Sequence, residues 1–400
     1  MRKIFQTRNL TFLWLGQTIS QSGDSIYQIG LLWLALELSA SKAVVGLVAM
    51  SAYLPAMLIS IFAGVVADRV NRRRIMLIAD AFRAIVILGL PIAWKLGILS
   101  TPMLALNAFI IAGAAAFFNP ARDAVIPQLV PCDGLMRANS LIQTSWQFSM
   151  LLGPLLAALL LQHFGIIHLF TVDSGAYFLS FIFILLMRPR AENKILAKTS
   201  SMEDLKSGLR YVRNEKVIFP LLLITIADNF FIMGPAYVGT PVFVKETLSG
   251  TAGNYALITG SYAVGMLIGT AGLLWLGNRI GKGRVLLIGM MLDGITFVPY
   301  FFADSITDLA LYSVIHSLAI PMLTISRASI IQEIVPHKMR GRVFALVNLA
   351  VVGLTAVSSG LSGLILEFID APTLFLIGGI LGCLCGVIGW LFARSLWNHE

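Results

Sequence analysis

Long apolar runs separated by short polar loops dominate this sequence. About twelve runs of roughly 20 apolar residues can be counted, and about 20 are needed for one helix to cross the hydrocarbon core of a bilayer. Of the 400 residues, 58% are hydrophobic and only 12% are charged, whereas a soluble domain averages about 25% charged residues. This composition excludes an ordinary soluble protein, and the length of the runs favours helices over barrel strands. We therefore predict an all-α integral membrane protein.

The runs fall into two groups of six, which predicts twelve transmembrane helices in two six-helix bundles. In the first group we expect helices at residues 10–36, 43–67, 75–95, 101–121, 138–162 and 167–187. In the second group we expect them at 217–239, 255–277, 284–303, 306–327, 343–367 and 373–393. The predicted domains are an N-terminal bundle (1–187), a cytoplasmic linker (188–216) and a C-terminal bundle (217–400).

The basic residues predict the orientation in the membrane. With the N-terminus inside, only Lys42, Lys95 and Lys245 of the 29 Lys and Arg lie in outer loops. Basic residues concentrate in cytoplasmic loops, so we expect both termini in the cytoplasm. Because the basic residues are spread over short loops, the net charge of +9 does not indicate nucleic-acid binding. No small-residue cleavage site follows Met1, so the first helix is expected to act as its own insertion signal.

The predicted linker contains an amphipathic helix. Its sequence from Ser200 to Glu203 has the form of a capping box, and Leu205, Leu209 and Val212 follow at helical spacing. We expect this helix to lie at the inner membrane surface. Its basic face is either a solvated linker beside anionic lipid or a regulatory site.

The two halves repeat one another. Arg122 and Arg327 are 205 residues apart, and the same spacing separates Pro131 from Pro336 and Arg137 from Arg342. Shared spacing at separate features predicts two bundles related by a pseudo-two-fold axis along the membrane normal, as in transporters with a midplane site.

A charged turn from Gly64 to Arg74 joins two of the expected helices. It carries arginines at 69, 72, 73 and 74, which are costly to move across a bilayer and hold the turn in the cytoplasm. The residue order G-x-x-x-D-R-x-x-R-R resembles the loop between the second and third helices of the major facilitator superfamily, with Asn71 where that family most often has Gly. The alternative is a simple topology anchor.

This loop predicts a cytoplasmic gate. Gly64 is expected to let two helices approach closely. Asp80 and Arg83 are expected to pair at i, i+3 as part of the gate, and the alternative is that they only stabilise their own helix. Arg122 could hold an anionic substrate instead of belonging to the gate. The predicted gate residues are Gly64, Asp68, Arg69, Arg72, Arg73, Asp80, Arg83 and Arg122.

Two further motifs resemble one branch of that superfamily. The pattern R-x-x-x-I-P-x-L-V-P from Arg122 to Pro131, followed by A-N-S-L, is similar to the drug:proton antiporter-3 branch, which includes bacterial macrolide and siderophore exporters. Gly153-Pro154 in the fifth helix resembles an exporter signature, although Ser149, Ala157 and Ala158 stand where that pattern has Gly. The resemblance implies an efflux transporter in the bacterial cytoplasmic membrane.

Asp24 and Asp228 are the predicted proton-coupling residues. They lie 204 residues apart, each near the middle of the first helix of its half, and an intramembrane carboxylate usually faces a cavity. The alternative for Asp24 is a structural carboxylate that is capped by a hydroxyl or paired with a cation. The residues expected to line the substrate cavity are polar or aromatic: Gln17, Gln21, Tyr27, Gln28, Trp146 and Phe230.

The other polar residues in the spans carry weaker indications. Asp293 is interpreted as structural, and His316 either relays protons or is a hydrogen-bonded core histidine. Cys132, Cys383 and Cys385 show neither a zinc nor a disulfide pattern, and no phosphate-binding loop is present. We expect no enzyme activity and no cofactor apart from protons as the coupling ion.

The leading hypothesis is a proton-coupled exporter of amphiphilic small molecules, such as macrolides, other drugs or siderophores, that works by alternating access. A lipid or lysolipid flippase of the same fold is the first alternative, and a receptor or scaffold that transports nothing is the second. We expect the partners to be the small-molecule substrate and the lipid bilayer, without nucleic acid, and the protein to be a monomer.

Overall fold

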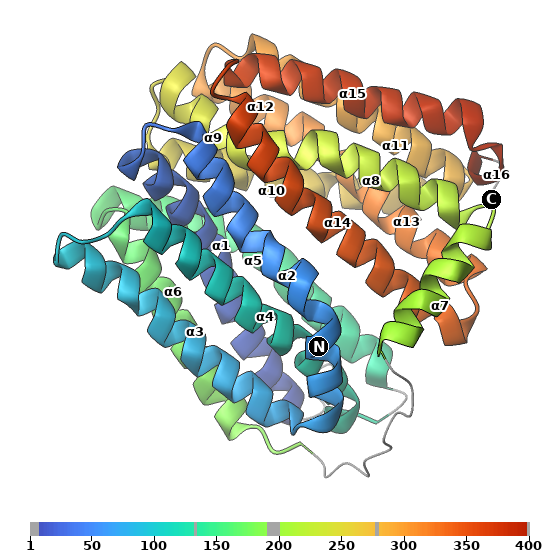
Figure 1. Ribbon diagram of the computed structural model, residues 1–400, viewed down its shortest axis with the longest axis horizontal. Helices are drawn as coiled ribbons and strands as arrows, with labels where there is room; N and C mark the ends of the chain where they lie inside the picture. Colours follow the sequence, from blue (N-terminus) through green and yellow to red (C-terminus); the bar gives the residue numbers. More distant parts are fainter. Residues whose placement is uncertain (1–7, 132–133, 190–200, 277–279, 398–400) are drawn as a thin grey trace. The chain divides into compact units, whose positions relative to one another are not determined.

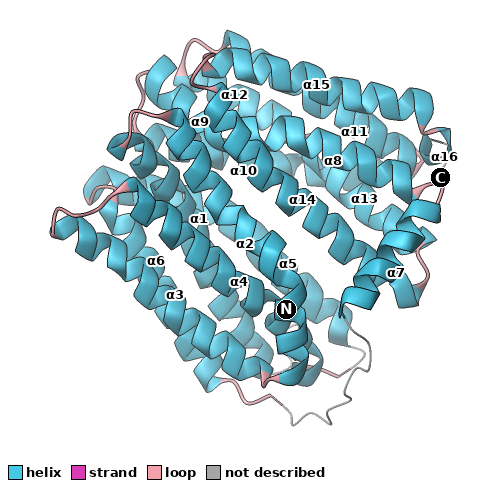
Figure 2. Cartoon of the chain, in the orientation of Figure 1, coloured by secondary structure: helices cyan, strands magenta, loops and turns pink. Residues whose placement is uncertain are grey.

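The computed structural model describes residues 8–131, 134–189, 201–276 and 280–397. The described residues form helices joined by loops, without a strand (Figure 2). The chain divides into two compact units. Unit 1 comprises residues 1–38 and 54–201, and unit 2 comprises residues 39–53 and 202–400. The second helix, α2, therefore begins in unit 2 and ends in unit 1.

Unit 1 is built mainly from five long helices, with the last part of α2. In Figure 1, α3 and α4 run beside each other, and α6 lies against both α1 and α3. The bounds are α1 Arg8–Leu38, α2 Lys42–Arg69, α3 Arg72–Lys95, α4 Thr101–Leu129, α5 Leu135–His163 and α6 Ile167–Leu186.

Unit 2 begins with the short amphipathic helix α7 and continues with the second set of long helices, several of them interrupted. The bounds are α7 Ser201–Asn214, α8 Ile218–Gly234, η2 Pro235–Gly239, α9 Thr240–Val242, η3 Phe243–Thr247, α10 Ala252–Leu276, α11 Lys282–Phe297, η4 Val298–Phe302, α12 Ile306–Ser317, α13 Ile320–Ile334, α14 His337–Ile365, α15 Ala371–Phe392 and α16 Arg394–Trp397. Ser200, which opens the predicted capping box, lies outside the described residues.

The expected twelve-helix membrane fold is confirmed. In the described residues, 11 helical segments are long and apolar enough to cross a membrane. The remaining long helix, α1, has 31 residues and is not among these 11 because its sequence carries several polar side chains. In the middle of the helix they include Gln17, Thr18, Ser20, Gln21, Ser22, Asp24, Ser25 and Gln28.

Several of the expected helix limits need correction. The span expected at 217–239 runs on to Thr247 as α8, η2, α9 and η3, and the helix expected at 343–367 begins earlier, at His337. The helix expected at 101–121 runs on to Leu129, so Arg122 lies inside a helix and does not end it. The helix expected at 306–327 is two helices, α12 and α13, with a break at Leu318 and Ala319. Pro321, at the start of α13, has no N–H to continue the preceding helix.

Three glycines of α1 form its contact with α6. Gly16 faces Ser180, Gly23 faces Asp173 and Ala176, and Gly30 faces Leu169 and Phe170. The order shows that the two helices are antiparallel. A spacing of seven residues keeps one stripe of a helix facing its neighbour along its length, and glycine lets the two backbones approach closely. The stripe therefore places the polar residues of α1 directly against α6.

Gly23→Ala is expected to destabilise unit 1, whereas Gly30→Ala is expected to be nearly neutral. A methyl group on Gly23 would lie 2.9 Å from the Cβ of Ala176 and would also collide with Asp173. The same group on Gly30 would meet the side chains of Leu169 and Phe170 at 3.2 Å, so these need to move by only a few tenths of an ångström. We expect Gly23→Ala to lower the free energy of unfolding by about 1–3 kcal/mol, the usual cost of overpacking. Thermal unfolding of both purified variants tests this, and equal melting temperatures would contradict it.

The start of α2 is bonded to the loop after α14, within unit 2. Glu367 accepts hydrogen bonds from the backbone N–H of Ala43 at 2.9 Å and the hydroxyl of Ser41 at 2.6 Å. Nearby, Lys42 pairs with Glu246 at 2.9 Å. The bonds from Ala43 and Ser41 favour the ionised carboxylate and hold the pKa of Glu367 below its ordinary value of 4.5.

Glu367→Gln is expected to lower the melting temperature slightly at neutral pH and not at all in strong acid. A carboxyl whose pKa is lower in the folded state stabilises the fold above its unfolded-state pKa, and this contribution is lost as the pH falls through the folded-state pKa. The wild-type and variant melting temperatures should therefore converge below about pH 4.5. Because Glu367 is exposed, added salt should also reduce the difference. A difference that is the same at all pH values would contradict the prediction.

Candidate functional site

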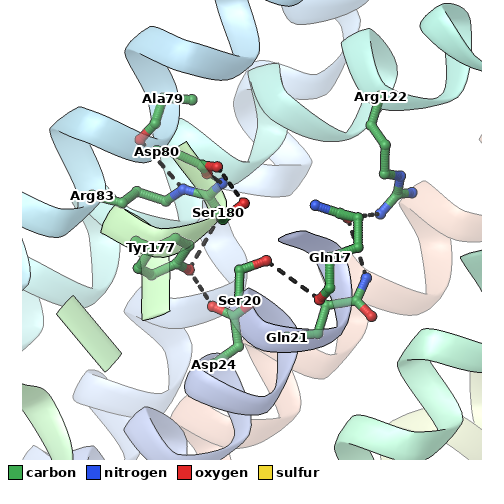
Figure 3. A network of polar contacts seen from close by, with 10 residues as sticks. All are labelled: Gln17, Ser20, Gln21, Asp24, Ala79, Asp80, Arg83, Arg122, Tyr177 and Ser180. Atoms are coloured by element: carbon green, nitrogen blue, oxygen red, sulfur yellow. Dashed lines mark hydrogen bonds and ion pairs between the residues drawn. The ribbon is translucent and has the colours of Figure 1, made fainter. Parts of the chain in front are cut away.

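Asp24 is held by residues of two other helices in unit 1. The hydroxyl of Tyr177, on α6, donates a hydrogen bond to Asp24 Oδ1. Arg83, on α3, donates from Nη1 to the same tyrosine oxygen at 3.2 Å. Figure 3 shows the three side chains in a row, with Tyr177 between the other two. Tyr177 therefore links the predicted coupling carboxylate to a buried cation.

Arg83 is surrounded by polar and aromatic groups on every side. It forms the expected ion pair with Asp80, one turn earlier on α3, and Asp80 also accepts a hydrogen bond from Ser180 at 2.7 Å. The guanidinium lies 4.2 Å from the ring centre of Tyr177 and 4.6 Å from that of Phe118, which adds cation–π attraction. Asp80 is 0% exposed and Arg83 is 4% exposed. This pair is buried beside Asp24.

A second polar chain runs from α4 across α1 to α5. Arg122 Nη1 donates to Gln17 Oε1 at 3.2 Å, and Gln21 donates to the same oxygen at 3.4 Å. Gln21 in turn accepts a hydrogen bond from the hydroxyl of Ser145 at 3.0 Å. Figure 3 shows Arg122 and the two glutamines on the side of α1 away from Tyr177. Arg122 also pairs with Asp123 at 2.8 Å.

The Gly153-Pro154 motif on α5 lies against α1. A methyl group on Gly153 would come within 3.2 Å of the carbonyl oxygen of Ser22 and would overlap the side chain of Ser25. One turn earlier, Ser149 Oγ donates to the carbonyl of Thr18 at 3.1 Å. Only a residue without a side chain fits at Gly153, so this motif sets the distance between the two helices.

The predicted cavity residues divide into buried and exposed ones. Tyr27 is 4% exposed, and its hydroxyl donates to Asn107 of α4 at 2.9 Å. Since that hydroxyl is already used inside unit 1, Tyr27 packs between helices and does not lie on an open surface. Trp146 is 43% exposed. Gln28 and Phe230 are partly exposed.

The basic turn between α2 and α3 binds helix ends within unit 1. Arg73 donates to the carbonyls of Ile184 and Leu185, at the C-terminal end of α6, where a positive charge is favourable. Arg72 donates to the carbonyl of Ala124 at 3.1 Å. Asn71 caps α3 by accepting from the N–H of Arg74, which explains how the turn works without the usual glycine.

For Arg69 and Gly64 no such contact is found among the residues that the structure describes. Arg69 is exposed. Among the described atoms, a methyl group on Gly64 would meet nothing within 4 Å, so the close helix contact predicted there is not found. The side chain of Asp68 lies outside the described residues. Arg83 contacts Tyr177 and Asp80 contacts Ser180, and the predicted partnership of this pair with Asp68 stays a prediction.

Unit 2 contains a second group of buried polar residues. Asp228, on α8, is 5% exposed, and its Oδ1 has no hydrogen-bond partner among the described residues. Its neighbour Asn229 donates to the hydroxyl of Thr355 at 2.8 Å and to the carbonyl of Val351 at 3.0 Å, both on α14. His316 lies 3.5 Å from Asp293, with both side chains 2% exposed.

Two residues of the site were missed in the sequence. Tyr177 looks like one of many aromatic residues in an apolar run, and only its position on α6 opposite Asp24 distinguishes it. Asp173 gave a usable signal, because a carboxylate inside an apolar span is expensive and usually functional. It is 0% exposed and lies against Gly23 of α1.

Comparison with known proteins identifies the family. A family model described as transmembrane secretion effector matches residues 4–399. The uncharacterized MFS-type transporter YfiS of Bacillus subtilis (strain 168) is 27% identical over 406 residues, covering 95% of this chain and 92% of that protein. Macrolide efflux protein A of Streptococcus pyogenes is 26% identical over 375 residues, covering 92% of each. A mutant of the nucleoside transporter NupG has a TM-score of 0.78 at 13% identity, covering 98% of this chain and 99% of that chain; this similarity concerns the fold alone. The chain belongs to the transmembrane secretion effector family of the major facilitator superfamily.

Proposed function

We propose that this protein is a proton-coupled exporter of amphiphilic small molecules that works by alternating access. The observation that carries the proposal is the position of Asp24: it is partly exposed, yet it is bonded through Tyr177 to the buried Arg83. A carboxyl group in this position is connected to the packing of three helices, and in this proposal it takes up its protons from water. The proposed cellular location is the bacterial cytoplasmic membrane with both termini inside, and the proposed working form is a monomer.

Protonation of Asp24 provides the coupling step in this proposal. The ionised carboxylate accepts the hydrogen bond of Tyr177 and attracts Arg83. A proton on Asp24 removes that attraction and changes the relative stability of arrangements in which α1 is held to α3 and α6. A proton can shift a conformational equilibrium only by its differential affinity for the two states, and the Tyr177–Arg83 pair supplies such a difference. Asp228 provides the corresponding carboxyl in unit 2.

The proposed substrates are amphiphilic, with macrolides as the first class to test. The exposed aromatic ring of Trp146 suits a bulky apolar ligand, and the partly exposed Asp24 suits a cationic group. The similarity to a macrolide efflux protein supports the same choice.

Efflux from cells that lack their own pumps tests the proposal. Wild type should export a macrolide or a cationic dye, and an uncoupler should abolish the export. Asp24→Asn should lose the uncoupler-sensitive export, whereas Asp304→Asn, the same chemical change at an exposed loop residue, should behave as wild type. Efflux that persists with the uncoupler would overturn proton coupling. Well-expressed protein without efflux of any compound in an amphiphile panel would overturn the export proposal.

A further inference from the structure

Asp173 is a buried carboxyl group without a hydrogen-bond donor among the described residues. It is 0% exposed, and neither of its oxygens has a hydrogen-bond partner among the described residues. Its carboxyl lies against the backbone of α1 at Gly23, one residue before Asp24. A fully buried carboxylate without a partner is too costly to keep ionised, and such groups take up a proton instead.

The ionisable groups around Asp173 come from three helices. They are Asp24 and Tyr27 on α1, Arg83 on α3, and Tyr177 on α6 itself. Asp80 joins this group through its ion pair with Arg83. On α5, which also contacts α6, the ionisable residues are Arg137 and His163, near its two ends. Three carboxyl groups therefore share one guanidinium. With all of them ionised the group would carry an excess of two negative charges in a low-dielectric interior.

The hydrogen bonds divide the three carboxyl groups into two kinds. Asp80 pairs with Arg83 and accepts from Ser180, and Asp24 accepts from Tyr177. Donors of this kind stabilise the ionised form of a carboxyl group. Asp173 accepts none from the described residues, so it is the member of the group whose neutral form costs least.

We infer that Asp173 and Asp24 form a two-carboxyl site that binds one proton, and that Asp173 holds this proton in the arrangement described here. Asp24, which is partly exposed, exchanges protons with water, and Asp173, which is sealed behind it, stores the proton. In the transfer one O–H bond on Asp24 breaks and one O–H bond on Asp173 forms, so Asp24 returns to the carboxylate that binds Tyr177. The role of the site in transport depends on the proposed function, whereas the protonation of Asp173 does not.

Infrared spectroscopy of the full-length protein in lipid nanodiscs tests the inference without measuring transport. The C=O stretching band of a protonated carboxyl group lies at a higher frequency than the bands of carboxylates and carboxamides. At neutral pH, Asp173→Asn should lose one component of this band, while Asp24→Asn and the exposed-loop variant Asp304→Asn should keep it. Subtracting the variant spectra removes the contributions of Asp228 and Asp293. An unchanged band in Asp173→Asn would overturn the inference.

A second variant covers a failure of Asp173→Asn to fold. Asp173→Glu keeps a carboxyl group but lengthens the side chain by one methylene, so the component assigned to Asp173 should shift in frequency. An unshifted band would overturn the inference.

The two proposals fail in different ways. Loss of the band component together with the absence of efflux in wild type would overturn the transport proposal and support the protonation of Asp173. An unchanged band together with uncoupler-sensitive efflux would overturn the protonation of Asp173 and support the transport proposal. If both proposals hold, Asp173→Asn should bind substrate as wild type does but lose export driven by a pH gradient.

Discussion

Arg83→Gln is expected to lower the free energy of unfolding by roughly 3–5 kcal/mol, the usual loss when one partner of a buried ion pair is removed. Arg83 is 4% exposed and contacts Asp80, Tyr177 and the ring of Phe118. Without the guanidinium, the buried Asp80 has no cation, and the polarised hydroxyl of Tyr177 loses its donor. The thermal unfolding midpoint of the purified variant, measured in one detergent, checks the result.

A double variant separates the loss of charge from the loss of packing. In Asp80→Asn with Arg83→Gln, neither member of the pair is charged, so we expect much of the stability lost in Arg83→Gln to return. Arg213→Gln is the matched control, because Arg213 is exposed in the last turn of α7, and its melting temperature should equal that of wild type. A wild-type melting temperature for Arg83→Gln would show that this cation does not balance the buried carboxylates.

Asp24→Asn is expected to abolish accumulation of substrate against its gradient in reconstituted vesicles while leaving substrate binding in place. Asparagine keeps the size of the side chain and can still hydrogen-bond to Tyr177, but it cannot carry a proton. One pH unit across the membrane is worth about 1.4 kcal/mol per coupled proton, which is roughly tenfold accumulation. Wild type should show this accumulation under an imposed pH gradient, and Asp24→Asn should not exceed the level without a gradient.

Controls within the same assay show whether the effect is specific to coupling. Binding of a labelled substrate to Asp24→Asn should be measurable, and exchange of labelled for unlabelled substrate should continue without a pH gradient. Asp228→Asn, assayed in parallel, shows whether the carboxyl group in unit 2 carries a second proton. Full pH-driven accumulation by Asp24→Asn would exclude Asp24 as the coupling residue.

The sequence was sufficient for the membrane fold because bilayer thickness imposes a length on every spanning helix. It was also sufficient for the pairing of Asp80 with Arg83, since residues three apart on a helix face the same side. It could not show that this pair belongs with Asp24. Tyr177, which joins them, is 153 residues from Asp24 in the chain, and an apolar helix such as α6 does not indicate by composition which face is turned inward.

The break between α12 and α13 and the burial of Tyr27 were missed for related reasons. A proline at position 321 permits an apolar run to be either one kinked helix or two helices, and the packing of the neighbouring helices decides between them. Tyr27 was expected to line the substrate cavity together with polar residues of α1, but its hydroxyl donates to Asn107 on α4. A polar face on a helix can therefore be directed at another helix as well as at water.

The polar character of α1 has a consequence for how the protein is made. The ribosome delivers α1 to the membrane more than a hundred residues before α6, which supplies the hydroxyl for Asp24 and the surface for its glycine stripe. Until then, Asp24 lacks this donor, and because a charged residue at the bilayer centre opposes insertion, we expect α1 to enter the membrane with its carboxyl group protonated or hydrated. We therefore expect chains truncated before α6 to be substrates for membrane quality control.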